Sequence, residues 1–288
     1  MRMTSTLARA LWLRTEPLHA VVYFDPECRG LGRAMGLKGF WMGYFAMRVG
    51  PLGPVGAAIA GSVLGAFAPR SVERSLPAAW EAVTPERALA ERARGAAAAL
   101  RRAVPGIDAL AGELAAPMAA MVADAPTLAR PLFAANQPLA ERIADPVERL
   151  WQLTTGLREF RGDAHLAALA DRELDGLESL VLAAATGRVP AETMRTDRGW
   201  TEDEWAAAAE RLRARGLVDA DAQATVGGRE LRQAVEDATD RLAARLLRPV
   251  TAEATDRLLD GLAEPVARLR AAGVPPRANP IGLPPRQD

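Results

Sequence analysis

Apolar residues in the first 170 positions recur at intervals of three and four, which is the spacing of one face of an α-helix. No alternation of apolar and polar residues, the mark of a half-buried strand, occurs there, so we expect no sheet in this part. Pro17 should kink the first helix or split it in two. The pattern predicts helices over residues 4–24, 40–49, 55–67, 85–103, 107–122, 126–135 and 138–159, with a short helix opening at Pro26.

Three helix starts carry clear signals. Asp25 precedes Pro26 and Thr84 precedes Pro85, so an N-cap side chain stands before a proline in the first helical position. Thr201 is followed by three acidic residues, which suit the positive end of a helix. We therefore expect helices to begin directly after residues 25, 84 and 201.

The elements become shorter after residue 169. Helices are predicted over 171–186 and 190–196 and from Thr201 to Gly216, then two short strands joined by the turn 219–221, then a long helix from about Gly228. This is the element order of a winged helix-turn-helix domain. The expected fold is mainly α, with an all-α domain over 1–168, the winged helix-turn-helix domain over 169–250, a C-terminal helix over 251–271 and a disordered tail over 272–288.

Composition and charge narrow the class of protein. Nearly half of the residues are apolar but only 5% are aromatic, a composition that favours helices. Basic and acidic residues number 36 each, so overall charge gives no argument for nucleic acid or a membrane. The distribution is uneven: residues 1–70 carry eight basic and three acidic side chains, whereas residues 171–250 carry 12 and 16, a balance of −4.

A single cysteine, Cys28, excludes an intramolecular disulfide framework and a cysteine-cluster metal site, and we expect a cytoplasmic protein. Residues 49–68 carry no charge and are long enough to span a bilayer. They consist mainly of Gly, Ala and Pro, which gain little from burial in lipid. We expect a buried helix there, with Gly61 and Gly65 allowing another helix close approach, and no membrane partner.

Residues 16–48, EPLHAVVYFDPECRGLGRAMGLKGFWMGYFAMR, hold six of the 14 aromatic residues, both tyrosines, the only lysine and one of two histidines. His19 and Tyr23 are four residues apart, as are Tyr44 and Arg48, so each pair shares a helix face. The stretch is interpreted either as buried aromatic core between helices or as a ligand pocket with these four polar groups.

Residues 205–240, with RLRARGLVDADAQATVGGRELRQAVEDATD, resemble the recognition helix, wing and following helix of MarR-type winged-helix regulators. The whole chain, over about 8–245, resembles a family of largely uncharacterised bacterial proteins. In that family an aromatic block like EPLHAVVYF…GFWMGYFAMR and a segment like REFRGDAHLAAL precede such a domain. The resemblance implies a fold and no established activity.

The chain departs from the MarR pattern where DNA would be bound. The wing tip is Asp219-Ala220-Asp221, and the recognition helix begins with Glu202, Asp203 and Glu204, all of which repel phosphates. Two alternatives remain open: DNA binding through a dimer that arranges its cations differently, or a domain used for dimerisation or for closing a pocket. The available cations are Arg195, Arg198, Arg211, Arg213 and Arg215.

The two histidines are the candidate catalytic groups. Gly162 and Asp163 suggest a helix end followed by an N-cap, which would place His165 in a first turn and favour its neutral form. No regular metal-ligand spacing links either histidine to the nearest carboxylates, so the sequence assigns neither a metal nor a cofactor. Those carboxylates are Glu16, Glu27, Glu159 and Asp163.

Two functional hypotheses follow. The first is a homodimeric, ligand-responsive regulator that binds a small organic molecule. The second is an enzyme for a hydrophobic or aromatic metabolite, haem- or metal-assisted or neither, with His19 or His165 as acid or base and Arg48 or Arg161 holding an anionic group. In both, we expect six side chains to line one cavity: His19, Tyr23, Trp41, Tyr44, Arg48 and His165.

Overall fold

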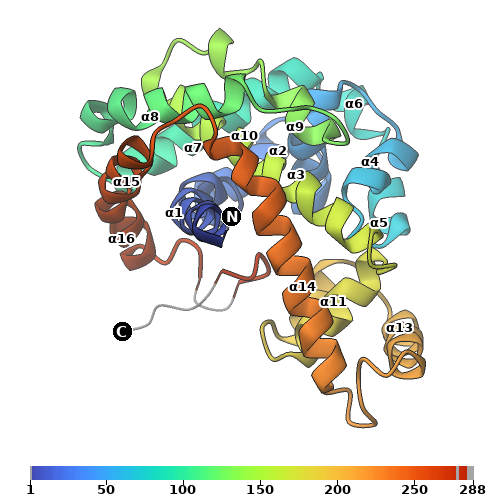
Figure 1. Ribbon diagram of the computed structural model, residues 1–288. Coiled ribbons are helices and arrows are strands. Elements are labelled where there is room, and N and C mark those ends of the chain that lie inside the picture. The colour runs from blue at the N-terminus through green and yellow to red at the C-terminus, as the bar shows by residue number, and fades with distance from the viewer. Residues whose placement is uncertain (1, 277–278, 284–288) are drawn as a thin grey trace.

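The computed structural model describes residues 2–276 and 279–283, and this part of the chain is almost entirely helical (Figure 1). The expected mainly α fold is confirmed. The two-stranded wing is not seen: within the described residues the only bridge is the antiparallel pair Val218–Ala224. The paired segments are too short to form strands, because the chain turns directly after Val218. The Asp219 carboxylate stabilises this turn by accepting from the amides of Asp221 and Gln223.

The N-terminal part, as we call helices α1 to α10, contains two of the helix starts that the caps predicted, those of α2 and α7. The Asp25 side chain accepts from the amides of Glu27 and Cys28 at the start of α2, and that of Thr84 accepts from Arg87 at the start of α7. The helices are α1 (Arg2–Phe24), α2 (Pro26–Ala34), α3 (Gly39–Val49), α4 (Ala57–Val63), α5 (Pro69–Glu73), α6 (Ala79–Ala82), α7 (Pro85–Ala103), α8 (Ile107–Ala123), α9 (Pro131–Asn136) and α10 (Pro146–Ala170). Short 3₁₀ turns lie at Gly50–Leu52 and Ala140–Arg142.

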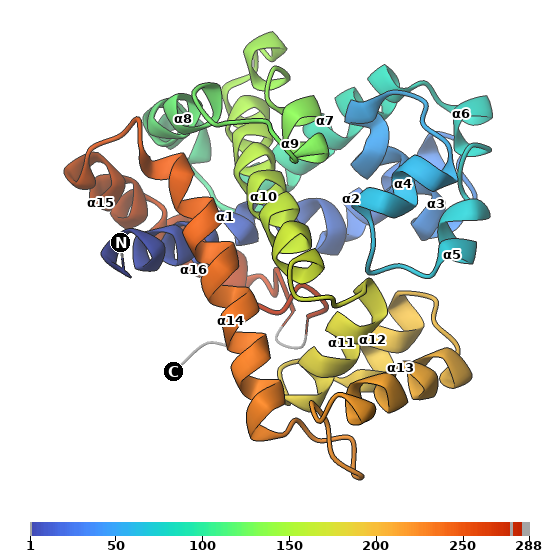
Figure 2. The same ribbon diagram turned by 45° about the vertical axis from the view of Figure 1, so that its right-hand side comes forward.

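Helix α10 is the centre of the fold and packs against α1, α7, α8, α9 and α14 (Figure 2). Trp151, Leu150 and Phe160 on this helix are fully buried. Phe160 meets Phe133 of α9 edge to face, with ring centroids 4.9 Å apart. A helix enclosed on all sides has no single apolar stripe, so its length was hard to read from the sequence.

Two expected helix breaks are absent. Pro17 lies inside an unbroken α1, because packing of that helix against α7, α10, α14 and α16 outweighs the lost hydrogen bond. Gly162 and Asp163 lie inside α10, which runs on to Ala170. Asp163 does act as a cap, but for another helix: its carboxylate accepts from the Phe133 amide in the first turn of α9, at 2.9 Å.

The expected helix over 55–67 is shorter, Ala57–Val63, and Gly61 has open space where a Cβ would stand. A helix does approach Gly65 closely: a Cβ on Gly176, the first residue of the helix Gly176–Ala185, would lie 1.7 Å from the Gly65 carbonyl oxygen. Helices α2 and α3 also approach closely, since a Cβ on Gly32 would lie 2.8 Å from the Gly43 Cα. None of the described helices is both long and apolar enough to cross a bilayer.

The C-terminal unit, residues 176–243, comprises α11 (Gly176–Ala185), α12 (Ala191–Asp197), α13 (Glu202–Ala214) and α14 (Val226–Ala243). Asp175 with Glu178 and Thr201 with Glu204 form capping boxes, and Thr225 caps α14. Its core is apolar and includes Leu182, Leu212 and Val235. Helix α14 leaves this unit and runs beside α10 and α1, so it belongs to both parts (Figures 1 and 2).

The chain beyond α14 returns to the N-terminal part. After a 3₁₀ turn at Ala244–Leu247, the single helix expected over 251–271 is two helices, α15 (Ala252–Gly261) and α16 (Ala263–Ala271). The predicted disordered tail is described over 272–276 and 279–283, where Asn279 and Leu283 are buried. Residues 277–278 and 284–288 of that prediction lie outside the described part.

Candidate functional site

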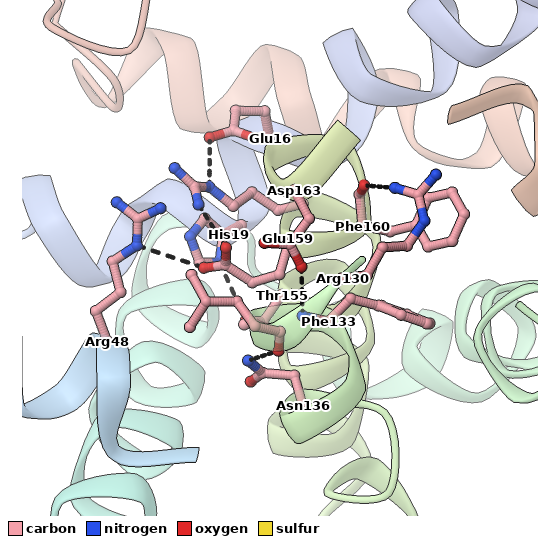
Figure 3. A network of polar contacts seen from close by, with 12 residues as sticks. Glu16, His19, Arg48, Arg130, Phe133, Asn136, Thr155, Glu159, Phe160 and Asp163 are labelled. Carbon is pink, nitrogen blue, oxygen red and sulfur yellow. Dashed lines mark hydrogen bonds and ion pairs between the residues drawn. The ribbon is translucent and has the colours of Figure 1, made fainter. Parts of the chain in front are cut away.

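Four of the predicted site residues meet in what we call the sealed cluster: His19, Tyr23, Tyr44 and Arg48, with Thr155 and Glu159 of α10. Figure 3 shows His19, Arg48, Thr155 and Glu159 of this cluster. The His19 Nδ1 lies 3.0 Å from the Thr155 Oγ1, and its Nε2 lies 3.1 Å from the Tyr23 hydroxyl. The His19 ring also stacks on the fully buried Trp151 ring, whose Nε1 donates to the His19 carbonyl. The contact predicted from the four-residue spacing of His19 and Tyr23 on α1 is therefore confirmed.

The partners of His19 settle its tautomer. The Thr155 hydroxyl donates to the Trp151 carbonyl, at 3.1 Å, so it accepts from the His19 Nδ1–H. The His19 Nε2 then carries a lone pair and accepts from the Tyr23 hydroxyl. Burial, together with the charges of Arg158, Arg48 and Arg92, lowers the pKa of His19 well below its ordinary value. The imidazole is neutral at neutral pH.

Arginine–carboxylate pairs complete the sealed cluster. Arg48 donates to the Tyr44 hydroxyl at 2.6 Å, and its Nε lies 3.5 Å from Glu159. Arg158 bonds Glu159 at 2.7 Å and lies 3.9 Å from Glu16 (Figure 3). Burial alone raises the pKa of the Tyr44 phenol, but the charges of Arg48, Arg198 and Arg158 outweigh it and the pKa is lowered.

No room for a ligand remains inside the sealed cluster. The space between its side chains measures about 10 Å³, roughly what one water molecule needs. The prediction that six side chains share one cavity is therefore wrong. Trp41 lies at the surface, 36% exposed, and His165 faces a different hollow.

That second hollow, which we call the joint cavity, measures about 260 Å³ and lies between the N-terminal part and the C-terminal unit. Trp12, Arg161 and His165 come from α1 and α10, whereas Arg232 and Glu236 come from α14. Apolar side chains also line the cavity: Leu166, Leu169, Leu180, Val189, Met194 and Ile281. A larger hollow of about 650 Å³ lies between α4 and α13 and is about as open to solvent as the joint cavity.

His165 is neutral for a reason other than the one expected. It lies inside α10, near the C-terminal end of that helix, and burial, with the nearby charge of Arg232, lowers its pKa to about 4. Its Nδ1 lies 3.2 Å from the Thr239 Oγ1, and that hydroxyl donates to the Val235 carbonyl. The His165 Nδ1 therefore carries the hydrogen, and its Nε2 keeps a lone pair.

Positive charge exceeds negative charge at the joint cavity. Glu236 faces Arg232 at 2.5 Å, Arg9 at 2.8 Å, Arg161 at 3.5 Å and Arg188 at 3.6 Å. The surrounding arginines outweigh the effect of burial and lower the pKa of Glu236 to about 2.

A second carboxylate, that of Asp240, accepts from Arg9 and Arg161, each at 2.6 Å. Four guanidinium groups thus share two carboxylates. Of these residues, the sequence analysis predicts only Arg161 as a binding residue. The spacing of Arg232, Glu236 and Asp240 at every fourth position of one helix was the available signal.

The C-terminal segment covers this cavity. Arg188 donates to the Gly282 carbonyl at 3.0 Å, and Arg198 donates to the Pro280 carbonyl at 3.2 Å. Asn279 fixes the segment by accepting from the Leu283 amide. Segments from both ends of the chain therefore contribute to one site.

The C-terminal unit is docked on residues 66–71 through the turn between α12 and α13. Arg70 of α5 forms a bidentate pair with Glu204 of α13, at 2.6 and 2.7 Å. The Trp200 indole donates to the Ala66 carbonyl at 3.0 Å. Gly199, at φ 77°, approaches so closely that a Cβ there would lie 2.0 Å from the Ser71 Oγ.

The five arginines considered for DNA all have partners within the chain. Arg195 pairs with Glu192 and Glu202, and Arg211 with Asp175 and Glu178. Arg213 pairs with Glu210, and Arg215 donates to the Glu173 carbonyl. Arg198 lies against the Phe67 ring, 4.4 Å from its centroid. A phosphate would compete with each of these contacts.

Among the described residues, no group of three or more His, Cys, Asp or Glu side chains is arranged to hold a metal ion. Of the carboxylates considered as third ligands, Glu16 and Glu159 pair with Arg158, Glu27 pairs with Arg102, and Asp163 caps α9.

Comparison with known proteins gives one result. No curated protein and no solved structure matches this chain. A family model described as a helix-turn-helix family matches residues 8–276, which covers the N-terminal part as well as the C-terminal unit. The chain therefore belongs to this helix-turn-helix family.

Proposed function

We propose that this protein binds a small molecule in the joint cavity and that occupancy of the cavity controls how the C-terminal unit is docked. One observation supports this most directly: the cavity is walled by both parts of the chain. A ligand there contacts α10 of the N-terminal part and α11 and α14 of the C-terminal unit at once. Its binding free energy therefore depends on their relative position.

The regulator that we propose is MarR-like, with α13 as the recognition helix and α14 following the turn. In helix-turn-helix proteins the first residues of the recognition helix contact base edges. Here those residues are acidic, and Glu204 is held by Arg70. The docked arrangement is accordingly the DNA-free state, and DNA binding requires α13 to leave residues 66–71. We propose a homodimer for the DNA-bound form, since such domains read two half-sites.

The test is to loosen the docking without touching the cavity. The double variant Arg70→Gln/Glu204→Gln removes the bidentate pair, and Arg268→Gln/Glu264→Gln removes a matched exposed pair on α16. DNA from upstream of the protein's own gene is titrated by fluorescence anisotropy at several salt concentrations. We expect the docking variant to bind more tightly than the wild type and the control, with affinity falling steeply as salt rises. If it binds no better than the control at low salt, the regulator proposal is wrong.

An enzyme is the second candidate, because His165 lines the same cavity as the arginines. Its neutral form, with a lone pair on Nε2, could accept a proton from a substrate that those arginines hold. A base with a pKa of about 4 is weak at neutral pH, so the enzyme hypothesis is the less favoured of the two. If the wild type turns over a substrate and His165→Asn does not, the enzyme hypothesis becomes the favoured one.

A further inference from the structure

We infer that the ligand of the joint cavity is a small organic anion, whose carboxylate or phosphate is held by Arg232 and Arg198 and whose body packs on the apolar side chains of the lining. This inference rests on the ligand-binding half of the proposed function and names the class of ligand. Three observations support it: buried arginine donors without partners, an excess of positive charge, and apolar side chains in the lining of the cavity.

The unpartnered donors come first. Arg232 Nη1 and Arg198 Nε are buried nitrogens that line or adjoin the cavity, and neither has a hydrogen-bond partner among the described residues. A buried guanidinium N–H without an acceptor is costly. Arg48 Nε and Arg92 Nε of the sealed cluster also lack a partner, but only about 10 Å³ of space is left there. At the joint cavity there is room for an acceptor that is supplied from outside the chain.

The charge balance specifies what that acceptor is. The described lining of the cavity holds five arginines and two carboxylates, so positive charge is in excess. The arginines are Arg158, Arg161, Arg188, Arg198 and Arg232, and the carboxylates are Glu16 and Glu236. Burial, with repulsion from Arg232, Arg9 and Arg161, lowers the pKa of Arg188 even though Glu236 lies beside it. An anion relieves this repulsion, whereas a neutral acceptor does not.

Arginine is also suited to the proposed groups by shape. A guanidinium presents parallel N–H donors that match two oxygens of a carboxylate or phosphate. Arg232 uses its Nη2 for Glu236, so its Nη1 is the donor left for the ligand.

The apolar side chains that line the cavity favour an organic anion over a free inorganic one. Leu166, Leu180, Val189 and Met194 offer no hydrogen bonds to a fully hydrated ion. They suit an aliphatic or aromatic body, and the volume of about 260 Å³ limits that body to roughly the size of a single ring.

The experiment uses isothermal titration calorimetry on the full chain at constant ionic strength. The probes are benzoate and phenyl phosphate, neutral benzamide as a shape control, and inorganic phosphate as a charge control. We expect the two organic anions to bind, and benzamide and inorganic phosphate to bind at least about tenfold more weakly. Equal binding by benzamide overturns the charge argument, and equal binding by inorganic phosphate overturns the apolar one.

Variants locate the binding and guard against misfolding. Arg232→Gln should weaken benzoate binding about tenfold or more, whereas Arg268→Gln, on the outside of α16, should leave it unchanged. Glu236→Gln removes the competing carboxylate and should tighten benzoate binding, a gain that misfolding cannot imitate. If Arg232→Gln binds benzoate like the wild type, or if no organic anion binds, the inference is wrong. A neutral ligand found in this cavity would leave the proposed function intact, while failure of the DNA experiment alone would leave the anion site intact.

Discussion

In the sealed cluster, Arg48 and Arg158 face Glu159 and Glu16, and about 10 Å³ of space is left. A third arginine, Arg92, donates there to the Met47 carbonyl and to the side-chain oxygens of Asn136 and Gln152. In the joint cavity, four arginines face two carboxylates around about 260 Å³. Both regions are rich in buried arginine, lie along α10 and contain a neutral histidine.

The difference lies in what each region lacks. The sealed cluster has filled its space with its own aromatic rings, and its extra arginine, Arg92, is held by neutral acceptors of the chain, so its chemistry serves stability. The joint cavity also holds more arginines than carboxylates, but there they stand beside empty space. Perturbed pKa values occur in both regions and do not separate them, because structural ion pairs perturb pKa values as binding sites do. An excess of positive charge next to empty volume indicates a ligand site more specifically than perturbed pKa values do.

The largest effect should follow from removing the shared carboxylate of the sealed cluster. Glu159→Gln leaves Arg48 and Arg158 without their main counter-charge inside the fold, and we expect a loss of about 3–5 kcal/mol in the free energy of unfolding. Urea denaturation measures it. Glu264→Gln, which breaks an exposed i, i+4 pair on α16, is the control and should change stability by less than about 0.5 kcal/mol. A small loss in Glu159→Gln would mean that the cluster is not sealed.

His165 should make the joint cavity sensitive to acid. Its pKa is about 4 in the folded chain and ordinary when unfolded, so its contribution is present above pH 6.5 and is lost as the pH falls through 4. The loss is about 3 kcal/mol when complete. Urea denaturation at pH 7 and pH 4 should show a larger decrease for the wild type than for His165→Asn. Identical decreases would show that His165 is not held neutral.

Asp163 should have the opposite sign and the smallest effect. Burial raises its pKa to about 6, so its stabilising contribution is present below pH 3.8 and is lost as the pH rises through 6. Asp163→Asn removes the charge, while the amide oxygen can still accept from the Phe133 amide. We expect a gain of about 1–2 kcal/mol at pH 7.5 that disappears near pH 4. A loss at pH 7.5 would mean that the ionised carboxylate is needed as a cap.

Local signals in the sequence predicted local structure. The caps at Asp25, Thr84 and Thr201, and the four-residue spacing of His19 and Tyr23, involve groups within one turn of each other, and all appear in the structure. The uninterrupted α10 was missed because a local pattern at Gly162 and Asp163 served a contact 30 residues away in the chain.

The joint cavity could not be read from the sequence for the same reason. Arg9 and Glu236 are 227 residues apart, and Arg161 and Asp240 are 79 apart. Apart from the four-residue spacing along α14, nothing local distinguishes these residues from the many that lie in solvent. Only the path of α14 back along α10 brings them together.

Helix α10 carries Thr155, which holds His19, and His165, which lines the joint cavity, ten residues further on. These positions are about 15 Å apart on one rigid rod. Because α14 packs against α10 and α1 as well as against α11, we expect the two regions to unfold together in one cooperative transition, although the sequence pattern divides into two domains.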